Sequence, residues 1–397
     1  MKLIFVTHWA NNMLIFRTWM LEEAVRLGHE VLVLCPPDKE ASHFARLGVR
    51  YIPWCLKRGG GAVNMLASVQ EAHKVIRFEK PDSTVVYCVQ PIMALLWAWK
   101  LGGRSGRLYP TFTGLGSLWT DLDEPTLKKR MIRGFVERVF GRLLPQAHKV
   151  FVLNRDDKAQ VASWNSKRLV AAPGILGVNA ESFLPKRESL PWICEVVQTM
   201  GEGVDLQHFQ IPTSEERMLA RSRWNIPPDA KVIGFVGRLI REKGAPDFLA
   251  LCRELHNDPT IHFLVVGDPD KGNPTSLTEV ELLELDAVPR MHRERWMNNV
   301  RPAYAAMDIL VFLSAREGMP ITPLEAMAMG VPVVGYDAVG TREIVPGDWL
   351  VPAGRSALLH GLLANPPVVR QVGRQYDRAI IQGALLSEFA NSVENFE

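Results

Sequence analysis

The sequence is poor in cysteine and in net charge, and each shortage excludes a class of protein. Its 397 residues contain five cysteines with no CxxC pair, so we expect small buried thiols in a reducing compartment and neither a disulfide framework nor a zinc site. The net charge is only +3, so the surface as a whole is not suited to nucleic acid, and any electrostatic role must be local. The cysteines are Cys35, Cys55, Cys88, Cys194 and Cys252.

Long apolar runs are also missing. The longest, Ile92 to Trp99, ends at Lys100 and is far below the roughly 18–20 residues that span a bilayer. The opening MKLIFVTHW is too short and too interrupted for a signal peptide. We therefore expect a cytoplasmic protein.

What the sequence does contain is an alternation of short apolar strands with helical segments. Hydrophobic residues make up 47% and charged residues 22%, which suits an ordinary globular chain of two domains at about 100–200 residues each. Continuous apolar strands between helices predict doubly wound α/β domains with parallel sheets. The expected strands are 2–6, 31–34, 84–89, 107–112, 149–153, 232–236, 261–266, 309–313 and 331–334.

A domain boundary is expected where this rhythm fails. Residues 165–205 contain scattered Pro and Gly without periodicity, which predicts an irregular excursion and a boundary near Gly203–Phe209. Two doubly wound halves predict a cleft between them, because ligands bind beyond the carboxyl ends of such strands.

The segment Ser314–Val334 is the most informative. It runs from a strand through a loop into a helix, and Thr322-Pro323-Leu324-Glu325 fits a capping box with Thr322 as N-cap and Pro323 as the first helical residue. Glu325 is then either a cap or a ligand-binding carboxylate. The helix N-terminus would attract a phosphate, and Glu317 on the preceding loop could accept hydrogen bonds from sugar hydroxyls.

A second anion-binding feature lies upstream, between a strand and a helix. Arg238 and Lys243 follow Gly237 and could offset the charge of a diphosphate; alone, each could equally be a solvated loop charge. Two phosphate features in one domain favour a nucleotide-diphosphate ligand.

These motifs give the chain a resemblance to a known family. GHEV at 28–31, TFTGLG at 111–116, GVDLQHF at 203–209, GFVGRLIREKG at 234–244, REGMPITPLEAMAMGVPVV at 316–334 and GTREIV at 340–345 occur in order. The set resembles the family-4 retaining GT-B glycosyltransferases, and TFTGLG resembles bacterial enzymes of surface-polysaccharide or lipid-linked glycan synthesis. The resemblance implies two Rossmann-like domains: an acceptor-binding domain at 1–205, a nucleotide-sugar domain at 206–365, and a tail at 366–397 that returns to the first domain.

The resemblance also implies roles for individual residues. Glu317 would steady the donor sugar as positive charge develops, Arg238 and Lys243 would stabilise the leaving diphosphate, and Glu325 would hold the ribose. We expect no cofactor and no metal, because the two cations could replace one. The further substrate-binding residues implied are Gly237, Met319, Pro320, Ile321, Thr322, Thr113 and Gly114.

Some segments depart from the family pattern. Many relatives carry a His where this chain reads Thr111-Phe112-Thr113, so no acid–base residue is implied there. The run Val266–Asp270 lacks the usual second Gly. Residues 165–200 and 286–300 have no counterpart that we can match, which leaves the base contacts unplaced.

The acceptor side is expected at residues 127–143. Six Lys or Arg oppose one acid there, and the apolar positions share one helical face, so this amphipathic helix either packs on the core or meets an anionic membrane surface. Arg17 could meet an acceptor phosphate or be a solvated helix charge.

The chain is therefore expected to move sugar from a UDP- or GDP-sugar to a lipid-diphosphate-linked or glycan acceptor at the inner face of the membrane. The alternatives are a sugar-nucleotide epimerase of the same fold and a non-catalytic nucleotide-sugar-binding protein.

Overall fold

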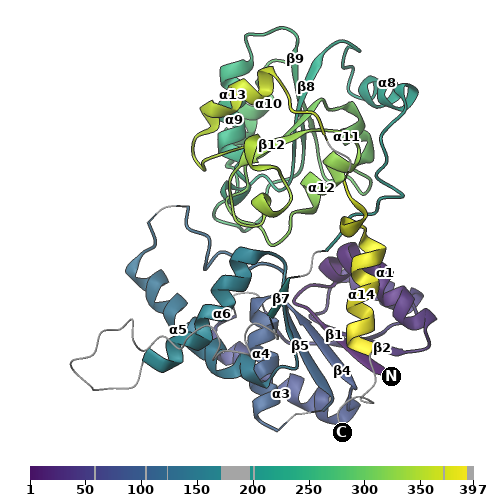
Figure 1. Ribbon diagram of the computed structural model, residues 1–397, viewed down its shortest axis with the longest axis vertical. Coiled ribbons are helices and arrows are strands. Elements are labelled where there is room, and N and C mark those ends of the chain that lie inside the picture. Colours follow the sequence, from purple (N-terminus) through teal and green to yellow (C-terminus); the bar gives the residue numbers. More distant parts are fainter. Residues whose placement is uncertain are drawn as a thin grey trace. The chain divides into compact units, whose positions relative to one another are not determined.

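The chain forms two compact units. A computed structural model describes residues 1–57, 60–102, 105–122, 124–170, 197–199, 202–369 and 372–390. Unit 1 comprises residues 1–119, 124–202 and 379–397, and unit 2 comprises 120–123 and 203–378. The chain therefore passes from unit 1 to unit 2 at Glu202 and Gly203 and returns at Arg378 and Ala379 (Figure 1). Among the described residues, no helix combines the length and apolar character needed to cross a membrane.

Unit 1 is built on a parallel sheet of seven strands. Their order is β3-β2-β1-β4-β5-β6-β7, so the direction of winding reverses between β1 and β4. The strands are β1 (Lys2–Val6), β2 (Glu30–Cys35), β3 (Arg50–Pro53), β4 (Ser83–Tyr87), β5 (Arg107–Phe112), β6 (Val150–Val152) and β7 (Val197–Thr199).

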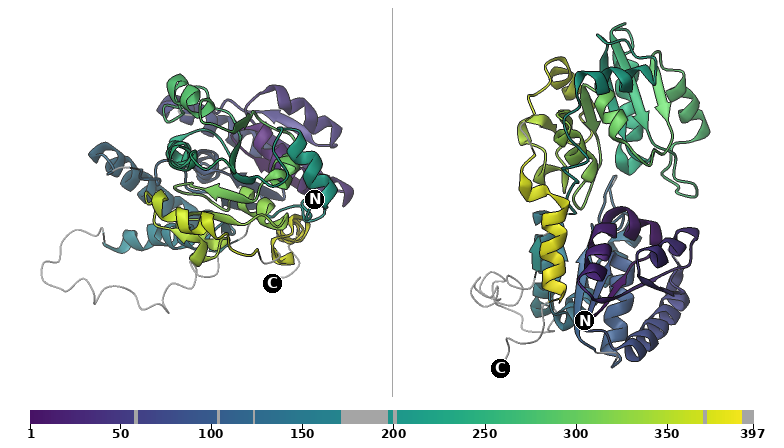
Figure 2. Two further views of the ribbon diagram at one scale, coloured as in Figure 1. Left: turned by 90° about the horizontal axis from the view of Figure 1, so that it is seen from above. Right: turned by 90° about the vertical axis from the view of Figure 1, so that its right-hand side faces the viewer.

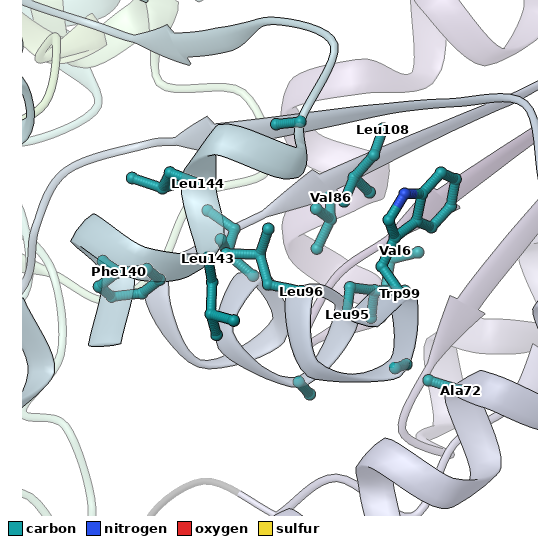
Figure 3. Close-up of a cluster of buried hydrophobic side chains, with 14 of the residues drawn as sticks. Val6, Ala72, Val86, Leu95, Leu96, Trp99, Leu108, Phe140, Leu143 and Leu144 are labelled. Carbon is teal, nitrogen blue, oxygen red and sulfur yellow. The ribbon is translucent and has the colours of Figure 1, made fainter. Parts of the chain in front are cut away.

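Helices cover both faces of this sheet because alternate side chains of each strand point to opposite faces. Val6, Val86 and Leu108 point to the face covered by α3, α4 and the end of α5, where Trp99 and Phe140 complete the core (Figure 3). The opposite face packs against α1, α2 and α14. The helices are α1 (Ala10–Arg26), α2 (His43–Arg46), α3 (Gly61–Glu79), α4 (Val89–Lys100), α5 (Leu127–Leu143), α6 (Arg155–Val170) and α14 (Arg378–Ala390).

Helix α14 belongs to the core of unit 1 although it follows unit 2 in the sequence. It lies beside α1 (Figures 1 and 2). Gln382 Nε2 donates to the Phe16 carbonyl at 2.6 Å, and Met20 N donates to Gln382 Oε1 at 3.2 Å. Phe389 is fully buried beside Phe5 and Tyr109. The last turns of the chain therefore complete a core that the first strand begins.

Unit 2 has a parallel sheet of six strands in the order β10-β9-β8-β11-β12-β13, reversing between β8 and β11. Its strands are β8 (Lys231–Val236), β9 (Ile261–Val266), β10 (Met291–Glu294), β11 (Ile309–Phe312), β12 (Val333–Tyr336) and β13 (Leu350–Val351). Its helices are α8 (Ser214–Ser222), α9 (Ala245–Leu255), α10 (Glu279–Asp286), α11 (Arg301–Ala306), α12 (Ile321–Ala328) and α13 (Leu359–Ala364). The two sheets confirm the predicted pair of doubly wound α/β domains.

Two local expectations are wrong. Cys55 is exposed and Cys88 partly exposed, whereas Cys35 and Cys252 are buried as predicted; Cys194 lies outside the described residues. The segment 165–205, expected to be irregular, includes the end of α6, which continues to Val170, and strand β7. Residues 171–196 lie outside the described part of the chain.

Helix α5 divides along its length, so neither interpretation of residues 127–143 covers the whole helix. Its final turns bury Phe140 and Leu143 in the core. Its first turns instead expose Leu127, Met131 and Phe135 at the periphery of unit 1 (Figure 1).

Candidate functional site in unit 2

The predicted catalytic residues of unit 2 lie on two loops that follow neighbouring strands. Residues 237–244 follow β8, and residues 313–320 follow β11. Because β8 and β11 are adjacent at the reversal of winding, both loops leave the sheet at the edge where doubly wound sheets bind ligands.

Lys243 and Glu317 form an ion pair across these loops. Lys243 Nζ donates to Glu317 Oε1, and both side chains are largely buried, with 25% and 14% of their surface exposed. Lys243 is therefore not a solvated loop charge.

Backbone contacts hold the two loops together. Ala315 N donates to the Glu242 carbonyl at 2.9 Å, and Ser314 Oγ donates to the same oxygen at 3.2 Å. The cation and the carboxylate are thus positioned by the backbone on either side of them.

Arg238 lies on the same loop as Lys243 but has a different partner. Its Nη1 donates to Asp270 Oδ2 at 2.6 Å, and 48% of its side chain is exposed. The guanidinium is therefore accessible while being oriented by the loop that follows β9.

Asp268 and Asp270 form an Asp-x-Asp pair. The expectation that no metal is needed also assumed that the sequence has no such pair, and this assumption is wrong. Asp270 accepts from Arg238, and Asp268 Oδ2 accepts from the backbone N of Trp296 at 3.1 Å. Both carboxylates thus connect loops of unit 2. Among the described residues, no group of three or more His, Cys, Asp or Glu side chains could hold a metal ion.

Glycines allow these loops to approach one another closely. A Cβ at Gly267, where φ is 154°, would lie 1.9 Å from the Gly237 carbonyl oxygen. A Cβ at Gly340, where φ is 82°, would lie 2.5 Å from the carbonyl oxygen of Glu317. Gly340 belongs to the GTREIV motif, and the sequence alone assigned it no role. Because it has no Cβ, the backbone of residue 317 can pack against the loop after β12.

The start of α12 differs from the predicted capping box. The helix begins at Ile321 with Pro320 as N-cap, and no side chain caps it. Thr322 and Pro323 are therefore inside the first turn, and Glu325 is in the helix body. The expectation failed because Pro320, at φ −75° and ψ 121°, turns the chain into the helix two residues early. Since proline has no side-chain acceptor, the amides of the first turn keep their donors for a ligand, next to Met319.

Glu325 has a partner that the sequence did not reveal. Tyr304 on α11 is fully buried and donates its hydroxyl to Glu325 Oε2 at 2.9 Å. Burial raises the pKa of Glu325 to about 7, opposed by the Tyr304 hydrogen bond and by the charge of Arg378. Burial, with the adjacent Glu325, also raises the pKa of Tyr304. Tyr304 thus fixes the orientation of the carboxylate, a role that only the fold reveals.

The two remaining predicted residues lie in unit 1. Thr113 and Gly114 follow β5, and Thr113 Oγ1 lies 3.3 Å from Cys88 Sγ. Cys88 joins β4 to α4 with a φ of 71°. Thr113 and Gly114 therefore lie at the carboxyl edge of the unit 1 sheet, whereas the other predicted residues lie in unit 2.

Comparisons with known proteins agree with this division. Residues 16–173 match the family model of the glycosyl transferase 4-like domain, and residues 230–364 match that of glycosyl transferases group 1. A D-inositol 3-phosphate glycosyltransferase of Corynebacterium urealyticum is 34% identical over 170 residues, which cover 41% of this chain and 39% of that protein. The chain thus spans about two fifths of that relative.

Solved structures of low identity share the whole fold. Sucrose-phosphate synthase of Thermosynechococcus elongatus superposes with a TM-score of 0.70 at 17% identity, covering 97% of both chains. Anabaena HepE in complex with UDP-glucose gives 0.65 at 17% identity, covering 98% of this chain and 95% of that one. The chain therefore has the GT-B fold of these solved glycosyltransferases, and residues 16–173 and 230–364 are similar to the glycosyl transferase 4-like and group 1 family models.

Proposed function

We propose that the protein is a retaining glycosyltransferase that moves a sugar from a UDP- or GDP-sugar to a lipid-diphosphate-linked or glycan acceptor. The product would belong to a cell-surface glycan such as a capsule, O-antigen or exopolysaccharide. Anabaena HepE, which shares the fold, was solved with UDP-glucose, which supports a nucleotide-sugar donor for this chain.

The observation that carries the proposal is the Lys243–Glu317 pair with Arg238 at the carboxyl edge of unit 2. A departing nucleoside diphosphate accumulates negative charge, and two fixed cations stabilise that charge more in the transition state than in the ground state. They supply the role that a metal has in other transferases, so we expect activity without one.

Glu317 and Glu325 would act on opposite ends of the donor. The Glu317 carboxylate, released from Lys243 by the diphosphate, would accept hydrogen bonds from sugar hydroxyls and steady the positive anomeric carbon. Glu325, oriented by Tyr304, would accept from the ribose hydroxyls. The acceptor would attack from the face that the diphosphate leaves, which retains the anomeric configuration.

The first turns of α5 support a membrane-bound acceptor. Leu127, Met131, Ile132 and Phe135 are 75%, 68%, 44% and 67% exposed, and the exposed Lys128, Arg130 and Arg138 surround them. Apolar side chains among cations suit the interface of an anionic membrane, where each cation contributes about 1 kcal/mol. We therefore place the enzyme at the cytoplasmic face of the plasma membrane, bound through the exposed first turns of α5.

The test is a transfer assay with UDP- and GDP-sugars and a lipid-diphosphate acceptor, in the presence of EDTA. We expect one donor to be consumed, and the new glycosidic bond, read by NMR, to keep the donor's anomeric configuration. Glu317→Gln should lower kcat by about 10²–10³-fold, as when one stabilising group is lost from a transition state.

Glu254→Gln is the matched control. Glu254 lies on α9, at the opposite end of that helix from Lys243, and accepts from His360, so kcat should be unchanged. Wild-type turnover by Glu317→Gln would contradict the site. If the configuration of one carbon of the donor sugar is inverted in the absence of acceptor, the protein is an epimerase. If nucleotide binds and no turnover occurs, the protein is a binding protein. Either outcome overturns the proposal.

A further inference from the structure

The carboxyl edge of unit 1 has its own ligand-binding geometry. Its winding reverses between β1 and β4, and ligands of doubly wound sheets bind where the winding reverses. A small cavity lies beside this reversal, at the carboxyl ends of β4, β5 and β6. It is lined by Tyr87 of β4, Thr111 of β5, Leu153 after β6, and Arg17, Glu202 and Gln382. None of these residues has a role in the donor site of unit 2.

Arg17 is the unusual group in this cavity. Only 2% of the residue is exposed, so it is not the solvated helix charge that the sequence allowed. Its guanidinium lies 3.8 Å from the centre of the Tyr87 ring, and its Nη1 donates to Asn12 Oδ1 at 3.3 Å. Burial raises the pKa of Tyr87 to about 12, so the phenol stays neutral and offers Arg17 its ring face and its hydroxyl but no negative charge. A buried cation of this kind requires an anion.

The anion in the structure is the carboxylate of Glu202. Arg17 Nη2 donates to Glu202 Oε1, and 13% of the Glu202 side chain is exposed. Glu202 comes from no strand or helix: it is the last residue of unit 1 before the chain enters unit 2 at Gly203. The arginine is thus held rigidly by α1, whereas its counter-ion comes from a connecting segment.

We propose that Arg17 forms a phosphate-binding site of unit 1, in which Glu202 occupies the position of the ligand and leaves when a phosphate binds. The remaining cavity has about 10 Å³ for the centre of a water molecule, which is room for one water. A phosphate therefore fits only where the carboxylate is now. Phosphate offers the guanidinium fork the same pair of oxygens as a carboxylate and carries more charge.

Unit 2 supports this assignment by analogy of position. There too a cation, Lys243, is paired with a carboxylate, Glu317, at the carboxyl edge of the sheet. At both edges, an internal carboxylate thus balances the charge of a buried or half-buried cation until an anionic ligand replaces that carboxylate. The identification of this phosphate as part of the acceptor rests on the proposed function. The binding of phosphate to Arg17 is independent of that function.

Competition sets the size of the expected effect. Glu202 is tethered to the site, so its effective concentration is of millimolar order or higher, and inorganic phosphate must compete with it. Glu202→Gln keeps the shape of the side chain and removes the competing charge. We therefore expect the phosphate Kd to fall at least tenfold in this variant.

The experiment is calorimetric titration of the full chain with inorganic phosphate in the absence of nucleotide. Glu202→Gln should bind more tightly than wild type, and Arg17→Gln/Glu202→Gln, which removes both charges and leaves neither buried alone, should not bind. Glu79→Gln is the matched control. Glu79 is a buried carboxylate of unit 1 that pairs with Arg50 and Lys2. These are the first residues of β3 and β1, so the pair lies at the amino edge of the sheet, opposite Arg17. The phosphate Kd of Glu79→Gln should therefore match that of wild type.

Two results would overturn the inference. Equal phosphate affinity in wild type and Glu202→Gln would mean that Glu202 does not occupy the site. Equal affinity in Glu202→Gln and the double variant would mean that phosphate binds elsewhere. Neither result depends on turnover: failure of the transfer assay would overturn the proposed function and leave this titration to decide on Arg17.

Discussion

At the scale of single residues, the candidate site of unit 2 depends on positions where there is no room for a side chain. Gly267 packs against the Gly237 carbonyl oxygen, and Gly237 N donates to Val266 O at 3.0 Å. The loop that carries Arg238 is therefore placed by direct contact between the ends of β8 and β9.

Gly267→Ala should disrupt this placement. The new Cβ would meet the Gly237 oxygen at 1.9 Å, and a φ of 154° is unfavourable for any residue with a Cβ. We expect UDP binding, measured calorimetrically, to weaken at least tenfold, because the loop carrying Arg238 must move. Gly347→Ala, where nothing lies within 4 Å of the added Cβ, should bind UDP as wild type does; equal binding by both variants would contradict the argument.

Glu325 predicts a dependence of stability on pH. Its pKa is raised from 4.5 to about 7 in the folded protein, so its contribution to stability is complete below pH 4.5 and is lost as the pH rises to about 7. Each tenfold change in proton affinity corresponds to about 1.4 kcal/mol, and Glu325 is partly exposed, so we expect a loss of about 2 kcal/mol.

The measurement is urea unfolding of wild type and Glu325→Gln at pH 5 and pH 8 without ligand. The free energy of unfolding of wild type should fall by about 2 kcal/mol more than that of the variant over this range. The same fall in both proteins would show that Glu325 does not titrate between these pH values.

Single residues also show where sequence reasoning ends. The spacing of Glu317 and Glu325 was legible because both belong to one continuous segment. Tyr304 was not, because its 21-residue separation from Glu325 is closed only by the packing of α11 against α12. The sequence could not decide between the two interpretations of Arg17 for the same reason, since its partner Glu202 is 185 residues away.

At the scale of elements, α5 is the segment whose environment changes along its length. Its last turns belong to the core, and its first turns expose apolar side chains among cations. The last turns of α5 therefore stabilise unit 1, and its first turns are available for a contact outside the protein.

Met131→Ser/Phe135→Ser should therefore weaken membrane binding without unfolding unit 1. Both side chains are exposed in water, at 68% and 67%, and each loses on the order of 1.5–3 kcal/mol of burial when it cannot enter the lipid. In sedimentation with vesicles containing anionic lipid, we expect the partition coefficient to fall at least tenfold, and wild type to bind neutral vesicles weakly.

Met218→Ser/Leu219→Ser is the control for general hydrophobicity. These side chains of α8 are 56% and 74% exposed and lie in unit 2, so vesicle binding should remain at the wild-type level. Equal partition of the α5 variant and wild type would place the membrane contact elsewhere or remove it.

Central elements were predictable and edge elements were not. The apolar strands 2–6, 107–112 and 261–266 were predicted with the observed bounds because they are buried on both faces. Strands β3 and β10 were missed because RYIP and MHRE are edge strands, partly exposed, with no continuous apolar run. The strand predicted to end at residue 89 ends at Tyr87, since Cys88 turns the chain into α4.

At the scale of the whole molecule, unit 2 is an insertion in unit 1. Apart from the short segment 120–123, unit 2 is entered at Gly203 and left at Arg378. The residues at these two ends pair: Val204 N donates to Tyr376 O at 2.8 Å, and Arg378 N donates to Val204 O at 2.9 Å. Beyond this crossing, α14 gives its side chains to the core of unit 1.

Phe389→Ala should consequently destabilise unit 1, although residue 389 follows unit 2 in the sequence. The ring is fully buried against Phe5, Tyr109 and Phe151, and such truncations cost about 3–5 kcal/mol. In urea unfolding followed by hydrogen exchange, protection of β1 should fall while protection of β8 is retained. Ile380→Ala, 53% exposed on the same helix, should change neither; loss of protection in β8 alone would contradict the assignment of α14.

The return of α14 also orders events during synthesis. The ribosome must add residues 203–378 after the sheet of unit 1 is made and before its last helix, which takes roughly 9–35 s at 5–20 residues per second. During that interval, the apolar side chains of β1 and α1 that later pack against Leu385, Leu386 and Phe389 are exposed to solvent. Unit 2, which is synthesised second, can thus finish folding before unit 1, because the core of unit 1 is incomplete until α14 is made.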